Sequence, residues 1–161
     1  MTTSTINTST LNTPMLTKIY KLLLSDGSFA ALALRIPAAI IFIAHGGQKL
    51  FGLFGGYGLE GTGQWMASIG LEPGYFMALM AGGAEFFGGL ALLVGLLVRP
   101  AALMLSITML VAIFTVHLAN GLFMSNNGYE FGLSLLAISV ALMFSGAGKL
   151  SVDNFLAKKL A

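Results

Sequence analysis

Four long apolar runs dominate the sequence, each close to the roughly 20 residues that a helix needs to cross a bilayer. The runs are apolar on nearly every side, whereas a membrane barrel strand alternates polar and apolar residues. Turn-forming segments separate them, including Arg99–Pro100 and residues 125–128. The pattern predicts an all-α integral membrane four-helix bundle, with spans over about residues 30–54, 74–97, 100–122 and 129–145.

The segments outside the spans have different characters. Residues 2–13 are rich in Thr, Ser and Asn, which predicts a disordered tail, and LTKIYKLLL (residues 16–24) predicts a short amphipathic helix on the membrane surface. We therefore divide the chain into a tail with an interfacial helix (1–28), a four-helix membrane domain (29–150) and a cytoplasmic tail (151–161). The glycine-rich residues 55–73 carry Tyr57 and Trp65 and predict a folded re-entrant or surface element.

Composition supports the membrane interpretation and excludes several functions. The chain has 161 residues, of which 57% are hydrophobic and 9% charged, against about 25% charged in a soluble domain. The net charge of +2 arises from few residues, and no basic run exceeds Lys158–Lys159, so nucleic-acid binding is not expected. The chain has no cysteine, which excludes thiolate metal sites, iron–sulfur clusters and thiol chemistry by this chain itself. No metal site is expected.

The distribution of Lys and Arg predicts the orientation of the spans. Basic residues lie before the first span, between the second and third, and after the fourth, whereas the loop between the third and fourth spans has none. By the positive-inside rule, both termini and Arg99 are expected in the cytoplasm.

Ionisable residues within a membrane are costly and are therefore candidates for function. In the first span, Arg35, His45 and Lys49 recur at steps of three and four, which is one face of a helix, and Gln48 lies beside them. In the second span, Glu85 shares its face with Ala and Gly residues that let a neighbouring backbone approach closely. Glu85 is therefore expected to point into the bundle.

The third and fourth spans add His117, Asn120 and Glu130 near their predicted outer ends. At about 1.5 Å per residue, His45 and Glu85 fall near mid-membrane and face each other. We expect one polar pocket that opens outward, with Glu85 and His45 as candidate catalytic residues. The other candidate pocket residues are Arg35, Gln48, Lys49, His117, Asn120 and Glu130.

Each of these residues also has a purely structural interpretation. Arg35 and Lys49 can extend to the two interfaces, and His117 and Glu130 can cap helix ends. Glu85 can belong to an ion pair that only holds the bundle together.

Three segments resemble the DoxX family: RIPAAIIFIAHGGQKLFG (residues 35–52), GGAEFFGGLALLVGLLVRP (82–100), and HLANG with NGYEFGLSLL (117–121 and 127–136). The resemblance covers about Leu32 to Leu150. It implies a small multi-pass protein of the bacterial inner membrane, in a family where some members are named as subunits of a thiosulfate:quinone oxidoreductase and others accompany membrane complexes that handle oxidants and thiols. The family's recurring polar positions match Arg35, His45, Lys49, Glu85, His117 and Glu130.

Three functions are consistent with the sequence. The first is the membrane subunit of a quinone- or sulfur-linked redox complex, in which partner subunits carry any thiols and the pocket binds a quinone or a small oxyanion. The second is a non-enzymatic membrane anchor or scaffold for soluble enzymes, and the third is a small proton-coupled transporter. A homo-oligomer is compatible with all three. Haem between His45 and His117 is not expected, because the two residues fall at different depths.

Overall fold

The computed structural model describes residues 14–25 and 28–160, and these residues form helices joined by short turns. The predicted tail over residues 2–13 lies outside the described residues. The α-helices are α1 (Pro14–Leu23), α2 (Phe29–Phe51), α3 (Gly58–Ser68), α4 (Gly74–Val94), α5 (Val98–Ala112), α6 (Glu130–Ser145) and α7 (Val152–Leu160). Single turns follow α2 (η2, Leu53–Gly55) and α5 (η3, Ile113–His117; η4, Leu118–Asn120), and another precedes α6 (η5, Met124–Asn126).

Three of the helices are long and apolar enough to cross a membrane. They are α2, α4 and the continuous helical run Val98–Asn120, which joins α5 to η3 and η4. Helix α6 is also apolar, but its 16 residues extend only about 24 Å. The prediction of an all-α protein is therefore confirmed for the described residues, with three or four helices that are candidates for crossing the membrane.

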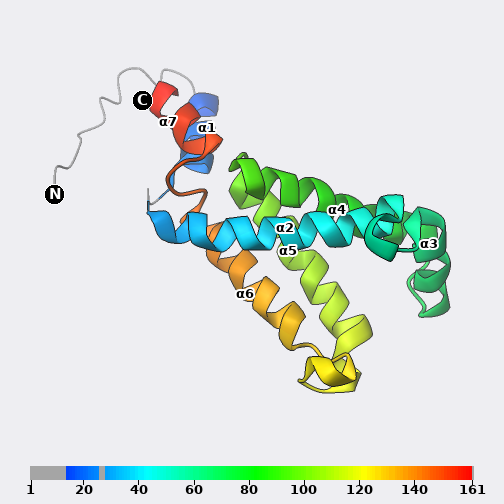
Figure 1. Ribbon diagram of the computed structural model, residues 1–161. Coiled ribbons are helices and arrows are strands. Elements are labelled where there is room, and N and C mark those ends of the chain that lie inside the picture. The colour runs from blue at the N-terminus through cyan, green and yellow to red at the C-terminus, as the bar shows by residue number, and fades with distance from the viewer. Residues whose placement is uncertain (1–13, 26–27, 161) are drawn as a thin grey trace.

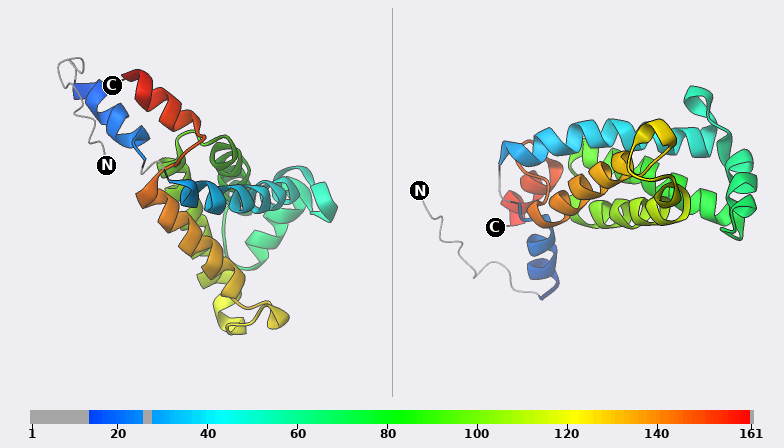
Figure 2. Two further views of the ribbon diagram at one scale, coloured as in Figure 1. Left: turned by 60° about the vertical axis from the view of Figure 1, so that its left-hand side comes forward. Right: turned by 90° about the horizontal axis from the view of Figure 1, so that it is seen from below.

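The membrane helices form two hairpins that meet at one end and splay apart at the other (Figure 1 and the left view of Figure 2). One hairpin pairs α2 with α4, and the other pairs α5 with α6. A core of fully buried side chains joins the hairpins near their meeting point and includes Phe42, Leu92, Leu105 and Leu142. We call the end where the hairpins meet the terminal end, because α1 and α7 also lie there, and the two separated tips the distal ends.

Glycine allows α2 and α4 to approach closely. A Cβ atom on Gly46 would lie 2.8 Å from the carbonyl oxygen of Gly82, and one on Gly89 would lie 2.9 Å from the backbone nitrogen of Ile43. Small residues at helix contacts are the usual means of close packing in membranes, where no hydrophobic effect drives helices together. This contact fixes which residues of α2 can reach α4.

Two charged side chains fasten the turn between α4 and α5 at the terminal end. Arg35 donates hydrogen bonds to the carbonyl oxygens of Leu92, 3.0 Å away, and Leu150, 2.5 Å away. The carboxylate of Asp153 accepts hydrogen bonds from the backbone N–H groups of Leu97 (2.7 Å) and Val98 (3.0 Å), which are at the start of α5. Burial raises the pKa of Asp153, although these N–H groups and the charge of Arg35 act in the opposite direction. Residues 151–161, expected as a tail, thus contain a helix that is tied to the bundle.

Candidate functional site

A buried ion pair joins the two helices of the first hairpin. The ammonium nitrogen of Lys49 lies 2.6 Å from Oε2 of Glu85, with the Lys49 side chain 24% exposed and the Glu85 side chain 4% exposed. Glu85 is turned into the protein, as its small neighbours on α4 indicated. A carboxylate in such surroundings is costly unless it is paired, and Lys49 is the partner that the structure provides.

Lys49 also lines a hollow of about 550 Å³ at the distal end of this hairpin. The remaining walls come from the end of α2, the connection to α3 and α3 itself, through Gln48, Gly55, Gly56, Tyr57, Gly61, Thr62 and Trp65. Ligand pockets of proteins commonly have volumes of about 300–1,000 Å³ and combine apolar walls with a few polar groups. Lys49 thus lines this hollow and also forms an ion pair with the buried carboxylate of Glu85.

Local backbone features bring α3 over the end of α2. Helix α2 ends at Phe51 and is followed by Gly52, whose φ of 70° lies in the left-handed region that favours glycine, and then by the turn η2. A Cβ atom on Gly56 would collide with the backbone of Gln48, so only glycine fits where the chain folds back. The hydroxyl of Thr62 then donates a hydrogen bond to the carbonyl oxygen of Lys49 at 3.4 Å. The sequence predicted a folded element here, but not that it would enclose Lys49.

His45 does not face Glu85, and this expectation is corrected. The imidazole of His45 is exposed, and its ring lies 6.1 Å from the ring of Phe131 on α6, tilted by 50°. Gly46 occupies the position on α2 that contacts α4. Since successive residues in a helix are rotated by about 100°, a neighbour of Gly46 cannot point in the same direction.

His117 and Asn120 lie in the connection between α5 and α6, Glu130 begins α6, and all three bond to the backbone of this connection. His117 Nδ1 is 2.9 Å from the carbonyl oxygen of Asn127, to which the amide of Asn120 also donates at 3.2 Å. Glu130 accepts a hydrogen bond of 2.6 Å from the backbone N–H of Met124.

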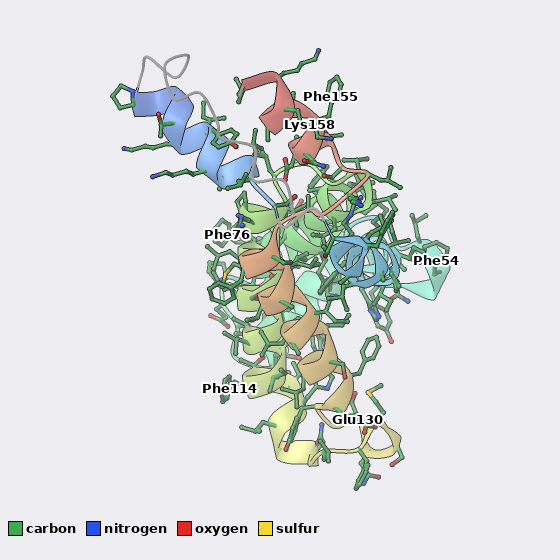
Figure 3. All side chains as sticks on the ribbon, turned by 90° about the vertical axis from the view of Figure 1, so that its left-hand side faces the viewer. Phe54, Phe76, Phe114, Glu130, Phe155 and Lys158 are labelled. Atoms are coloured by element: carbon green, nitrogen blue, oxygen red, sulfur yellow. The ribbon has the colours of Figure 1, made fainter. Side chains whose placement is uncertain are left out.

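The predicted single pocket is therefore divided into separate places. In Figure 3, Glu130 at the start of α6 and Phe54 in η2 are well separated. Arg35 is at the terminal end, where it bonds to backbone carbonyls. Only Gln48 and Lys49, with Glu85 behind them, remain together at the hollow. The physical reason is the splay of the two hairpins, which separates residues that a parallel bundle would place side by side.

Comparisons with known proteins identify relatives of this chain. The model of the DoxX family matches residues 30–118. A Bacillus subtilis protein named "Putative oxidoreductase CatD" is 37% identical over 127 residues, covering 79% of this chain and 87% of the relative. The inner membrane protein YqjF of Escherichia coli K12 is 37% identical over 134 residues, covering 80% of this chain and 92% of the relative. The uncharacterized membrane protein Rv3486 of Mycobacterium tuberculosis is 30% identical over 150 residues, covering 86% of this chain and 88% of the relative. No solved structure matches the chain significantly.

Proposed function

Because this chain belongs to the DoxX family and is a multi-pass inner-membrane protein, we propose that it is the membrane component of a redox system and binds a quinone in the hollow beneath α3. The observation that carries the proposal is that Lys49 both lines the hollow and forms an ion pair with the buried carboxylate of Glu85. The name of the Bacillus subtilis relative, an oxidoreductase, agrees with this class of function.

The hollow suits a flat ring that carries polar oxygens. Tyr57 and Trp65 provide aromatic surfaces on which a ring can stack. Lys49 and Gln48 provide N–H donors for a carbonyl or oxyanion oxygen. A small oxyanion would use the same donors without needing the aromatic walls, so the aromatic residues favour the quinone.

The ion pair supplies a route for protons. A quinone takes up protons together with the electrons that reduce it, and Lys49 can donate a proton to an oxygen placed in the hollow. Lys49 is then neutral, and Glu85, whose carboxylate lies 2.6 Å from the Lys49 nitrogen, can return a proton to it after taking one up from water. We therefore keep Glu85 as the proton-carrying residue and assign the role of its relay partner to Lys49 instead of His45.

The electrons must reach the hollow from another protein if the donor is a thiol or another sulfur compound. The chain contains no cysteine, so it cannot form a disulfide or a persulfide itself. We propose that a partner subunit carries that chemistry, and that the DoxX chain provides the quinone site in the membrane.

We infer that the hollow opens to the periplasm. Exposed lysines concentrate on α1, α7 and the segment before α7, all at the terminal end. The positive-inside rule assigns this end to the cytoplasm, and the distal ends then face the opposite compartment.

The single tryptophan of the chain, Trp65, allows a direct test because it lines the hollow. Titration of the purified protein with a short-chain quinone should quench Trp65 fluorescence saturably, and Lys49→Gln should weaken binding at least about tenfold, as expected for a lost charge-assisted hydrogen bond. Lys21→Gln, an exposed lysine on α1, serves as the matched control and should leave binding unchanged.

The proposal fails if quenching does not saturate, or if Lys49→Gln binds as well as the wild type. Binding of a soluble enzyme without any quinone binding would instead support the membrane-anchor function. Proton-coupled flux of a solute into proteoliposomes, again without quinone binding, would support the transporter.

A further inference from the structure

The terminal end carries a concentration of exposed positive charge. Among the described residues of α1, α7 and the segment that joins α6 to α7, the only acidic side chain is Asp153, which is buried against the start of α5. The exposed acidic residues Glu60 and Glu72 lie at a distal end instead. The exposed lysines of the terminal end are Lys18, Lys21, Lys149, Lys158 and Lys159.

Exposed apolar side chains accompany these lysines. The ammonium nitrogen of Lys149 lies 4.7 Å from the ring centre of Phe29, and that of Lys159 lies 4.6 Å from the ring centre of Phe155. Phe29 is 60% exposed, Phe155 58% and Leu150 75%. A phenyl ring beside a lysine suits the boundary between acyl chains and head groups, because the ring can enter the apolar layer while the ammonium group stays with the phosphates.

Helices α1 and α7 present these residues together. They pack against each other beyond the ends of the membrane helices, as Figures 1 and 2 show. The exposed side of α1 carries Lys18 and Lys21, while Leu23 is buried. In Figure 3, Phe155 and Lys158 both lie on α7, at the opposite end of the molecule from Glu130.

We propose that α1, α7 and the Lys149–Leu150 segment form a binding surface for anionic lipid head groups. The lysines contact the phosphates, and Phe29, Leu150 and Phe155 enter the head-group and acyl boundary. We assign lipid, and not an acidic protein, as the binding partner of this surface, because the lysines are mixed with exposed apolar side chains next to the end of a membrane helix. Its contribution is to hold α7, and with it Asp153 and the α4–α5 turn, against the bilayer.

The charge on this surface makes the interaction dependent on lipid composition and on salt. Each lysine brought to an anionic membrane surface changes the binding constant by roughly fivefold. The effect weakens as salt shortens the screening length, which is about 10 Å at 0.1 M and about 3 Å at 1 M. Attraction to a neutral phosphatidylcholine surface lacks this contribution.

The absence of native cysteines makes the test straightforward. A fluorescent probe attached to Val152→Cys, an exposed position on α7, would report on the surface in nanodiscs of the full-length protein, and a probe at Gln64→Cys on α3 would be the control. When phosphatidylglycerol is added to phosphatidylcholine nanodiscs, quenching of the Val152→Cys probe by iodide in the water should fall at least about threefold. Quenching by a nitroxide on the lipid head group should rise, and high salt should reverse both changes. The Gln64→Cys probe should show neither change.

Two sets of variants separate charge from folding. Changing all four lysines of α1 and α7 to Gln (Lys18→Gln, Lys21→Gln, Lys158→Gln, Lys159→Gln) should abolish the response to phosphatidylglycerol, while changing the same four to Arg should preserve it. The proposal is overturned if the probe is equally accessible to iodide in both lipid compositions. It is also overturned if polyglutamate in solution protects the probe and anionic lipid does not, since the surface would then bind acidic protein.

Discussion

The two partners of the buried ion pair should contribute unequally to stability. Lys49→Met removes the cation and leaves the carboxylate of Glu85, whose side chain is 4% exposed, without a partner. Glu85→Gln leaves the Lys49 ammonium, which is 24% exposed and borders the hollow, free to reach water. The amide oxygen of the new Gln can also still accept a hydrogen bond from Lys49.

The expected magnitudes follow from these two situations. Leaving one charge of a buried pair without its partner costs about 3–5 kcal/mol, and we assign this value to Lys49→Met. Glu85→Gln exchanges a charged hydrogen bond for a neutral one and should cost about 1–2 kcal/mol. The difference, about 1–4 kcal/mol in favour of Glu85→Gln, corresponds to roughly 5- to 900-fold in the unfolding equilibrium.

Equilibrium unfolding in mixed micelles of dodecyl maltoside and dodecyl sulfate, followed by circular dichroism, would measure both free energies. The double variant Lys49→Met/Glu85→Gln tests the coupling, and it should be more stable than Lys49→Met alone because no buried charge remains. If Glu85→Gln destabilises as much as Lys49→Met, or if the two effects simply add, the ion pair does not have the buried and exposed sides described above.

Three further predictions concern other parts of the molecule. Gly46→Ala should cost about 1–3 kcal/mol in the same unfolding assay, because its Cβ would lie 2.8 Å from the Gly82 carbonyl oxygen. Gly83→Ala is the control, because no neighbouring atom lies within 4 Å of its new Cβ, and it should be neutral or stabilise the protein by up to about 1 kcal/mol. Glu130→Gln should leave quenching of the single tryptophan by quinone unchanged, since Glu130 bonds within the α5–α6 connection, and a weaker quinone affinity would contradict the separation of the two distal ends. Burial raises the pKa of Asp153 above its ordinary value of 3.8, so the folded protein keeps this proton to higher pH than the unfolded chain. The stabilising contribution of Asp153 is therefore fully present below pH 3.8 and is lost as pH rises through the raised pKa, and hydrogen exchange of α7 should show this fall in the wild type but not in Asp153→Asn.

The membrane helices could be predicted from the sequence because lipid imposes a simple requirement on each one. A helix in hydrocarbon satisfies its own backbone, so its length and apolar character are visible locally. The burial of Glu85 could also be predicted from the sequence, since Gly82 and Gly88 on the same helix face indicate close packing. The predicted boundaries differ mainly where α2 ends at Phe51 and α4 at Val94, each followed by a glycine that terminates the helix.

The composition of the site could not be predicted in the same way, because it depends on how the helices diverge. The spacing of Arg35, His45 and Lys49 assigns them to one broad face of α2, but the second hairpin buries that face fully only near the terminal end, and His45 is contacted only at its side by the ring of Phe131. Arg35 is consequently buried, whereas His45 is exposed. Helix α3 covers Lys49 because the chain turns back tightly at Gly56, where its backbone contacts that of Gln48. The hydrophobic pattern of the sequence contains no signal for such a contact.

The central claim is that Lys49, backed by Glu85, holds a quinone beneath α3. Mass spectrometry of the small molecules retained by gently purified protein tests it most directly, with wild type, Lys49→Gln and the control Lys21→Gln prepared in parallel. We expect a quinone in the wild type and in Lys21→Gln, and its loss from Lys49→Gln. Equal amounts of quinone in all three proteins, or none in the wild type, would contradict the claim.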